Sequence, residues 1–158
     1  MSEKKSISRR RFVKGMATTT AGMATFGSSL GMSAQSYSRI IGANERMNIG
    51  VIGCGGMANA HMRALLEMKQ SDNVQIAAVN DVYTNRLDQA KELTQARAFK
   101  NYQEILDKKS IDYVLIATPE HWHYQMTLDA IDAGKHIYVE KPMTHTIEQA
   151  KSIVEKVA

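Results

Sequence analysis

The chain has 158 residues, of which 44% are hydrophobic and 23% charged, a balance typical of a globular domain and not of a disordered or fibrous chain. Its single cysteine, Cys54, excludes an internal disulfide framework and a cysteine-based metal cluster. The net charge of +4 comes from residues 1–14, which hold six basic residues and one acidic residue, so the near-neutral remainder offers no basic face and we expect no nucleic-acid partner.

The N-terminal segment Ser8–Lys14 resembles the twin-arginine export motif, in which paired arginines, a phenylalanine and an apolar residue precede a hydrophobic stretch. Residues 15–32 are uncharged but rich in Gly, Ser and Thr, which makes them too weakly apolar for a permanent membrane span. This order predicts a signal peptide over 1–34, cleaved near Ala34, and a linker over 35–46; a flexible basic tail is the alternative. We therefore expect the twin-arginine export machinery as a partner, a periplasmic or otherwise exported location, and no stable membrane span after processing.

From residue 47 onward, short β-branched apolar runs alternate with segments of helical periodicity, which is the pattern of βαβ units. In chain order the expected elements are a strand at Met47–Ile52, a helix at Met57–Met68, a strand at Val74–Val79, a helix at Thr84–Ala96 with Thr84 as its N-cap, a helical turn at Tyr102–Leu106, a strand at Tyr113–Ala117, a helix at Trp122–Ala133 ended by Gly134, a strand at His136–Val139 and a helix at Ile147–Val157. Because crossovers between parallel strands are right-handed, this order predicts an α/β fold with a doubly wound parallel sheet, a dinucleotide-binding Rossmann domain over 47–158. Its ligand crevice is expected at the carboxyl ends of the strands.

A glycine-rich turn lies between the first predicted strand and the first predicted helix, where Gly53-Cys54-Gly55-Gly56-Met57-Ala58 has the form G-x-G-x-x-A. In this pattern Gly53 allows the tight turn, Gly55 lets the backbone approach a pyrophosphate, and Ala58 allows close packing of helix on strand. The helix N-terminus adds free N–H groups and a positive dipole. We therefore predict that the turn binds a cofactor through Gly53, Gly55, Gly56, Met57 and Ala58; an ordinary glycine-rich turn is the alternative.

An acidic residue, Asp81, closes the second strand 23 positions after Ala58, near the spacing of about 20 residues expected for the acid that binds the ribose hydroxyls. A carboxylate at this place repels a 2′-phosphate, so we expect NAD as the cofactor. NADP is the alternative, because Arg86 lies close enough in sequence to reach a phosphate and is therefore also a predicted cofactor contact.

Two further polar segments follow the third and fourth predicted strands. In the first, Thr118–His123, two histidines stand two positions apart, but no third ligand lies at metal-site spacing, so we predict no metal and instead a contact with cofactor and substrate, or packing at the helix start. The second is Glu140-Lys141-Pro142. A lysine at a strand end beside a nicotinamide would orient a substrate hydroxyl and share its proton; a surface lysine in a loop is the alternative.

Taken together, these residues resemble the Gfo/Idh/MocA oxidoreductases. The likeness extends from about Asn48 to the end of the chain and rests on Ile49–Gly55, Asp81, Ala117–Pro119 followed by His121–His123, and Gly134–His136 leading into Glu140-Lys141-Pro142. The resemblance implies an NAD(P)-dependent enzyme acting on sugars, cyclitols or related polyols. It also implies that Lys141 is catalytic, that Gly53, Gly55 and Asp81 bind the cofactor, and that Thr118, Pro119, His123 and Glu140 contribute to the cofactor site near the nicotinamide. Exported family members with twin-arginine leaders occur.

Members of that family continue with a last Rossmann strand and a large α/β domain, which supplies further substrate residues and often the oligomer interface. We therefore expect the sheet to be incomplete at its C-terminal edge and the C-terminal substrate domain to be absent, as in a truncated or fragmentary chain that is inactive alone, while the full-length protein is expected to form a homo-oligomer. Three functions stay open: a dehydrogenase, an NAD-dependent glycosidase of the same fold, and a non-catalytic cofactor-binding module. Glu-Lys-Pro favours the dehydrogenase, because the glycosidases of this fold tend to depart from it.

Overall fold

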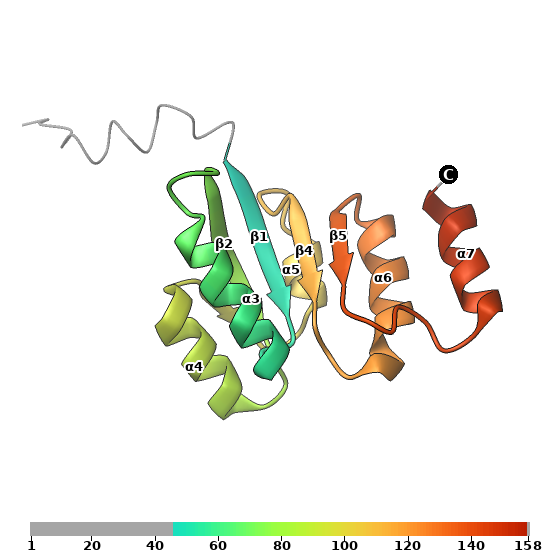
Figure 1. Ribbon diagram of the computed structural model, residues 1–158, viewed down its shortest axis with the longest axis horizontal. Coiled ribbons are helices and arrows are strands. Elements are labelled where there is room, and N and C mark those ends of the chain that lie inside the picture. The colour runs from blue at the N-terminus through green and yellow to red at the C-terminus, as the bar shows by residue number, and fades with distance from the viewer. Residues whose placement is uncertain (1–45, 158) are drawn as a thin grey trace, which may run out of the picture. The chain divides into compact units, whose positions relative to one another are not determined.

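A computed structural model of the protein describes residues 46–157, so the predicted signal peptide over 1–34 lies outside the described residues. The elements follow one another as β1 (Met47–Ile52), α3 (Gly56–Glu67), β2 (Val74–Asn80), α4 (Thr84–Thr94), β3 (Arg97–Phe99), α5 (Gln103–Leu106), β4 (Tyr113–Ile116), the 3₁₀ turn η1 (Glu120–Trp122), α6 (His123–Asp132), β5 (His136–Val139) and α7 (Ile147–Val157) (Figure 1). No helix among these residues has the length and hydropathy needed to cross a membrane.

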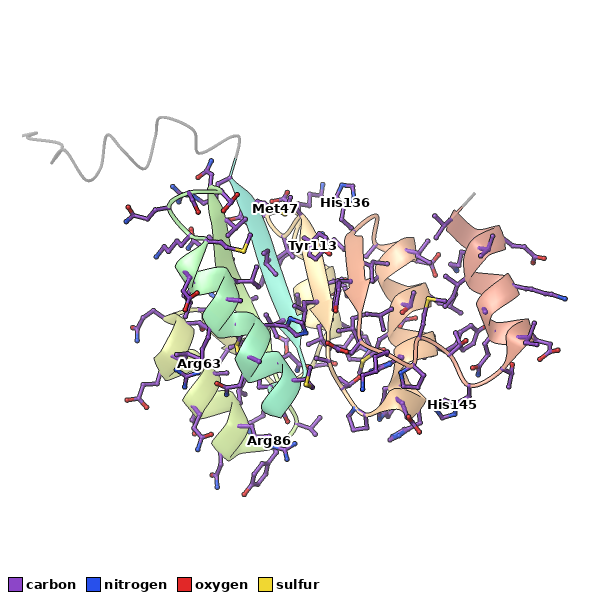
Figure 2. The ribbon with its side chains drawn as sticks, viewed as in Figure 1. Met47, Arg63, Arg86, Tyr113, His136 and His145 are labelled. Carbon is purple, nitrogen blue, oxygen red and sulfur yellow. The ribbon has the colours of Figure 1, made fainter. Side chains whose placement is uncertain are left out.

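The five described strands form one parallel sheet in the order β3-β2-β1-β4-β5. From β1 the chain proceeds through β2 to β3 at one edge, and then returns past β1 to β4 and β5. The strand order therefore reverses between β1 and β4, which is the topological switch point where open α/β sheets bind ligands. The first residues of β1, β4 and β5, which are Met47, Tyr113 and His136, lie at one end of the sheet, and Arg86 lies at the opposite end with the strand carboxyl ends (Figure 2). The structure confirms the predicted α/β class and doubly wound topology.

Two apolar clusters fill the space between sheet and helices, one on each face. Val51 and Ile52 are adjacent on β1 and fully buried, yet they belong to different clusters, because successive side chains of a strand point to opposite faces. The Val51 cluster takes residues from α3 and α4, including Met62, and the Ile52 cluster takes residues from α5 and α6. Burying a side chain of this size contributes roughly 1.5–3 kcal/mol. The two clusters therefore fix both helical layers against the sheet.

The structure corrects the expected elements in three places. The strand β3, at Arg97–Phe99, was not predicted; it is three residues long and pairs only with β2. Thr84 was predicted as the N-cap of its helix, but the N-cap is Tyr83, and Thr84 is already the first helical residue. The helix expected to start at Trp122 begins at His123, because residues 120–122 form the 3₁₀ turn η1. The predicted stop at Gly134 is confirmed, with a φ of +65° just after the C-cap of α6.

Candidate functional site

A cavity of about 690 Å³ opens at the carboxyl ends of the strands, within the size range of ligand-binding clefts. Its walls come from the glycine turn, the end of β2, the start of α4, the segment before and within α5, and the loop after β4. Eight of the residues predicted to bind a cofactor line it: Gly53, Gly55, Gly56, Met57, Asp81, Arg86, Thr118 and Pro119. Segments separated by more than sixty residues in the sequence thus face one space. The roles assigned to these residues stay predictions, and the geometry shows what each of them can do.

The glycine turn requires glycine at its first position. Gly53 has a φ of +85°, and a Cβ built there would lie 2.8 Å from the Ala117 carbonyl oxygen and 2.9 Å from Thr118 Cγ2. The helix α3 then starts at Gly56 without a side-chain cap, so its first N–H groups have no partner within the helix. A Cβ at Gly56 would meet nothing within 4 Å. This end of α3 is therefore open to an anion.

Ala58, predicted within the cofactor-binding turn, is fully buried and lines no cavity; it packs in the cluster that contains Val51. Its place in the structure is the packing of α3 against the sheet. An alanine there lets the helix start near the sheet, which brings the open N-terminus of α3 to the rim of the cavity.

The carboxylate of Asp81 connects the end of β2 to the glycine turn. Its Oδ2 accepts a hydrogen bond of 2.8 Å from the Cys54 N–H, and its Oδ1 accepts one of 2.8 Å from the Tyr83 N–H. Because each carboxylate oxygen has a second lone pair, the group can still accept from two ribose hydroxyls in the cavity that it lines. Asp81 therefore shapes the turn as well as offering a negative charge to the ligand.

Cys54 occupies the variable position of the turn but offers no reactive thiol. Its side chain is buried, and its Sγ–H donates to the Asn80 carbonyl oxygen at 3.3 Å. Burial, and in second place the charge of Asp81, raise the pKa of the Cys54 thiol to about 12. The thiol is therefore neutral at ordinary pH, and its role here is packing.

Arg86 provides a cation at the rim of the cavity. Its guanidinium lies 5.8 Å from the centre of the Tyr83 ring, and a Cβ on Gly55 would lie 3.9 Å from its Nη1. Tyr83 and Arg86 thus form a cation–π pair beside the glycine turn. An arginine at this distance from the turn can reach a phosphate group of a ligand held there.

A smaller pocket of about 170 Å³ adjoins the first and shares with it Met57, Ala117 and Thr118. Its other lining residues are Glu120, His123, Glu140 and Lys141. Lys141 follows the end of β5 by two residues, and its side chain is exposed. Among residues 46–157 the structure gives the Lys141 ammonium no hydrogen bond or ion pair. The amine predicted to be catalytic therefore belongs to a residue that lines a pocket at the edge of the main cavity, where its charge acts on the neighbouring Glu140 carboxylate.

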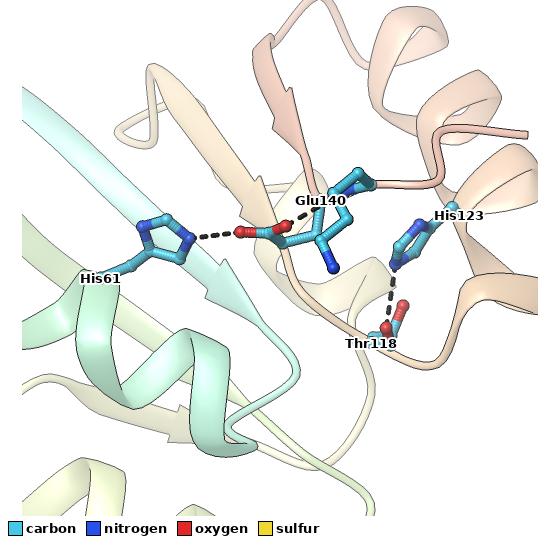
Figure 3. Close-up of polar contacts among 5 residues, drawn as sticks. His61, Thr118, His123 and Glu140 are labelled. Atoms are coloured by element: carbon cyan, nitrogen blue, oxygen red, sulfur yellow. Dashed lines mark hydrogen bonds and ion pairs between the residues drawn. The ribbon is translucent and has the colours of Figure 1, made fainter.

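Glu140, predicted as a cofactor contact, has a protein partner that sequence reasoning missed. His61 Nε2 lies 2.5 Å from Glu140 Oε1, and the other oxygen of the carboxylate accepts a hydrogen bond of 3.1 Å from the Lys141 N–H (Figure 3). The bond from His61 is the main reason that the pKa of Glu140 lies below its ordinary value, and the Lys141 N–H lowers it further. The two residues are 79 positions apart, and no local pattern in the sequence signals their contact.

His123 is buried and both of its ring nitrogens contact backbone carbonyl oxygens. Nδ1 lies 2.8 Å from the Pro142 oxygen and Nε2 lies 2.9 Å from the Thr118 oxygen (Figure 3). His123 thus joins the loop after β4 to the loop after β5, with its ring at the wall of the smaller pocket. His121, the other histidine of the segment, instead lies tilted against Trp122. Within the described part of the chain, no group of three or more His, Cys, Asp or Glu side chains is arranged to hold a metal ion.

A doubly wound parallel sheet, an uncapped helix that starts in a glycine turn, and an acid that ends the second strand together define a nucleotide-binding Rossmann domain. The chain belongs to the GFO_IDH_MocA oxidoreductase family with an NAD-binding Rossmann fold, whose family model matches residues 47–158.

The sequence identity of the chain to curated relatives and to solved structures is similar, between 25% and 29% for the three proteins described next. It is 29% identical to the alpha-N-acetylgalactosaminidase of Shewanella oneidensis over 95% of its own length and 37% of that protein. It is 29% identical to a levoglucosan dehydrogenase solved in complex with NADH, with a TM-score of 0.66 over 71% of this chain and 32% of that one. KijD10, a 3-ketoreductase from Actinomadura kijaniata solved with NADP, is 25% identical, with a TM-score of 0.64 over 71% of this chain and 34% of that one. The chain spans about a third of the length of these proteins.

Proposed function

We propose that this chain binds NAD in the cavity at the strand carboxyl ends and is the cofactor-binding part of an oxidoreductase acting on a sugar, cyclitol or polyol hydroxyl. The observation that carries the proposal is the convergence on one cavity of an open helix N-terminus, a conformationally required glycine and a carboxylate, contributed by the turn of Gly53–Met57 and by Asp81. The likeness to a levoglucosan dehydrogenase solved with NADH supports it.

In this proposal the uncapped N-terminus of α3, at Gly56 and Met57, would hold the pyrophosphate. Asp81 would accept from the ribose hydroxyls, and Thr118, which lines both the main cavity and the smaller pocket, would lie between the cofactor and Lys141. The bound cofactor supplies a nicotinamide ring that accepts or donates a hydride. The neutral amine of Lys141 would accept the proton of the substrate hydroxyl at Nζ during oxidation, and the resulting ammonium would stabilise the negative charge on that oxygen and return the proton during reduction.

Cofactor preference tests the role of Asp81. The protein should bind NADH more tightly than NADPH, and Asp81→Asn should narrow the ratio of the two Kd values by about tenfold, because like charges facing each other in an interface cost on the order of several kcal/mol. Asn keeps the shape of the side chain but offers one oxygen in place of two, so either the Cys54 or the Tyr83 N–H loses its acceptor, and the ratio of the two Kd values is therefore the readout. Asp88→Asn, an exposed carboxylate on α4, is the matched control for loss of charge and should leave the ratio unchanged. Equal affinities for NADH and NADPH in the unmodified protein would contradict the proposal that Asp81 selects against the 2′-phosphate.

The catalytic role proposed for Lys141 needs the full-length protein that carries this chain. Lys141→Met should lose most of its turnover, about 10²–10⁴-fold for one positioned acid–base group, and should still bind NADH. Lys151→Met, on an exposed face of α7, is the control. Binding of NADH without any turnover of sugars or polyols in the unmodified protein would favour a non-catalytic cofactor-binding module instead.

A second candidate function is an NAD-dependent glycosidase, which the identity to an alpha-N-acetylgalactosaminidase favours. Such an enzyme oxidises a sugar carbon transiently and returns the hydride before the product leaves, so NAD is not consumed. Full-length protein incubated with NAD and an alpha-N-acetylgalactosaminide would then release the free sugar with no net formation of NADH. A dehydrogenase would accumulate NADH in step with the oxidised sugar.

We further propose that the protein is exported by the twin-arginine route, on the basis of the Ser8–Lys14 motif. Replacing Arg9 and Arg10 together by Lys keeps the charge and should abolish export and processing, because the receptor recognises the paired arginines. Replacing Lys4 and Lys5 by Arg is the matched control. Normal processing of the double Lys variant would show that export does not depend on the motif.

A further inference from the structure

The tripeptide Glu140-Lys141-Pro142 is fixed on both sides of Lys141 by histidines from two different helices. His61, on α3, pairs with the Glu140 carboxylate (Figure 3). His123, the first residue of α6, contacts the Pro142 carbonyl oxygen. Neither contact involves the Lys141 side chain. We call these two contacts the histidine clamp.

On the first side, the contact is short, specific and largely protected from water. The side chain of Glu140 is only 10% exposed and that of His61 28% exposed. The His61 ring also packs edge-on against Tyr138 of β5, with ring centroids 5.4 Å apart, which fixes the direction of Nε2. The second oxygen of Glu140 accepts the N–H of Lys141 itself. The backbone of Lys141 is therefore bonded, through one carboxylate, to a helix that begins at the glycine turn.

On the other side, His123 contacts the residue after Lys141. Its Nδ1 faces the Pro142 oxygen and its Nε2 faces the Thr118 oxygen. At 2% exposure the ring is enclosed by protein, and its two contacts connect the loop after β4 to the loop after β5. Thr118 lines both the main cavity and the smaller pocket. The loop that carries Lys141 is thus held by contacts to two parts of the proposed cofactor site: to α3 through His61, and to the Thr118 loop through His123.

We propose that His61 and His123 are positioning residues, which fix the Lys141 backbone relative to the glycine turn and to the Thr118 loop while leaving its ammonium free for substrate. The effect of the histidine clamp on catalysis rests on the proposed function. The two contacts themselves do not depend on it. A group that acts on a bound substrate must keep its place closely, since a displacement of about 1 Å costs on the order of 10²-fold in rate. The clamp supplies that constraint from protein atoms alone, before any ligand arrives.

Amide hydrogen exchange at the Lys141 N–H, followed by NMR in this chain without cofactor, tests the His61 side directly. His61→Leu removes the donor that holds the Glu140 carboxylate, so the bond from the Lys141 N–H to Glu140 Oε2 should open more often and exchange at this amide should accelerate about 10- to 100-fold. His61→Gln keeps an amide donor and should restore most of the protection. Arg63→Leu, an exposed residue of the same helix, is the matched control. Unchanged exchange in His61→Leu would overturn the clamp.

Kinetics in the full-length protein test the positioning role. His61 lines neither cavity, so His61→Leu should change the Kd for NADH by less than about threefold while kcat falls about 10- to 100-fold, and His61→Gln should recover kcat. His123→Gln replaces two separated ring nitrogens by a single amide nitrogen, so it should not bridge the Pro142 and Thr118 carbonyl oxygens as the ring does and should likewise lower kcat. Unchanged kcat in both His61→Leu and His123→Gln would overturn the positioning role. If the unmodified protein fails to bind NADH while exchange still accelerates in His61→Leu, the proposed function fails and the clamp stands.

Discussion

At the scale of single residues, the geometry of the site depends on positions where adding or removing one atom would create a clash or break a hydrogen bond. Gly53 has no room for a Cβ, Asp81 uses both carboxylate oxygens on backbone N–H groups, and Glu140 does the same with a histidine and a backbone N–H. In each case the residue type follows from geometry close to the cavity. The stability of the protein therefore responds unevenly to substitutions that look alike in the sequence.

Two glycines of the same turn should differ sharply when replaced by alanine. Gly53→Ala meets the Ala117 carbonyl at 2.8 Å and requires a positive φ, so we expect a loss of about 2–4 kcal/mol in the free energy of unfolding. Gly56→Ala has open space and lies in the first turn of α3, so it should be neutral or stabilising by up to about 1 kcal/mol. Urea unfolding of both variants measures the difference. Equal losses would contradict the geometry of the turn.

The thiol of Cys54 should be unreactive in the folded protein. Because burial raises its pKa to about 12, almost none of it is thiolate at pH 8, and iodoacetamide should alkylate the native protein far more slowly than protein unfolded in urea. Mass spectrometry after timed exposure at pH 8 measures both rates. Rapid alkylation of the native protein, with its secondary structure retained, would contradict the burial of Cys54.

The lowered pKa of Glu140 predicts a defined dependence of stability on pH. Since the pKa in the folded state lies below the ordinary value of 4.5, the ionised group contributes stability above that pH and loses it as the pH falls through the folded pKa. The difference in unfolding free energy between the unmodified protein and Glu140→Gln should therefore be largest near pH 7 and shrink below about pH 4. Urea titrations at both pH values test this, with Glu155→Gln, an exposed carboxylate on α7, as the control. A difference that does not change with pH would speak against the pair.

Most of the candidate site could be predicted from the sequence because its residues stand in short runs directly after strands. Gly53, Asp81 and Thr118 follow the ends of β1, β2 and β4 by one or two residues, so each carries a local signal, and parallel strands bring such ends together. His61 could not be predicted this way. It lies within a helix, its partner is 79 residues away, and only the packing of α3 beside the end of β5 brings the two side chains together.

At the scale of elements, the predicted strands and helices recur with small shifts at their ends, and the exceptions have physical causes. The three residues of β3 are too few for a recognisable alternation, and the strand forms because β2 offers it an unpaired edge. The start of α4 differs because Tyr83 is the N-cap and no side chain caps the helix; Asp81 accepts the N–H of Tyr83 itself, one residue before the helix. The end of α6 follows its glycine, as local chemistry predicts.

A lysine links the elements around β5. The Lys135 ammonium, between the end of α6 and the start of β5, donates to the carbonyl oxygens of Lys108 and Ile111 at 2.7 and 2.9 Å. Lys135→Met removes both bonds from these carbonyl oxygens, and we expect a loss of about 1–3 kcal/mol in the free energy of unfolding. Lys151→Met, on the exposed side of α7, should change it by less than about 0.5 kcal/mol. Urea unfolding compares the two variants, and equal effects would mean that the bonds contribute nothing.

At the scale of the whole domain, topology assembles the site. The chain leaves β1 in one direction and later returns to its other side, so loops that are distant in sequence meet where the strand order reverses. The main cavity lies at this point, and the smaller pocket with Lys141 lies beside it. A ligand that extends across the cavity would therefore contact residues on both sides of the switch point between β1 and β4. A fluorescent side chain on the β4 side should then detect a ligand that is bound at the glycine turn after β1.

The single tryptophan of the chain is such a probe. Trp122 lines the main cavity on the side of the loop after β4, opposite the residues of α4, and its indole is half-exposed. Because NADH absorbs light where tryptophan emits, NADH bound in this cavity should quench the Trp122 emission by energy transfer. A titration should give the same Kd from this quenching as from the fluorescence of NADH itself. Trp122→Phe should abolish the tryptophan signal and leave binding measurable through the cofactor. Saturation seen by NADH fluorescence with no change in Trp122 emission would show that NADH binds elsewhere on the protein.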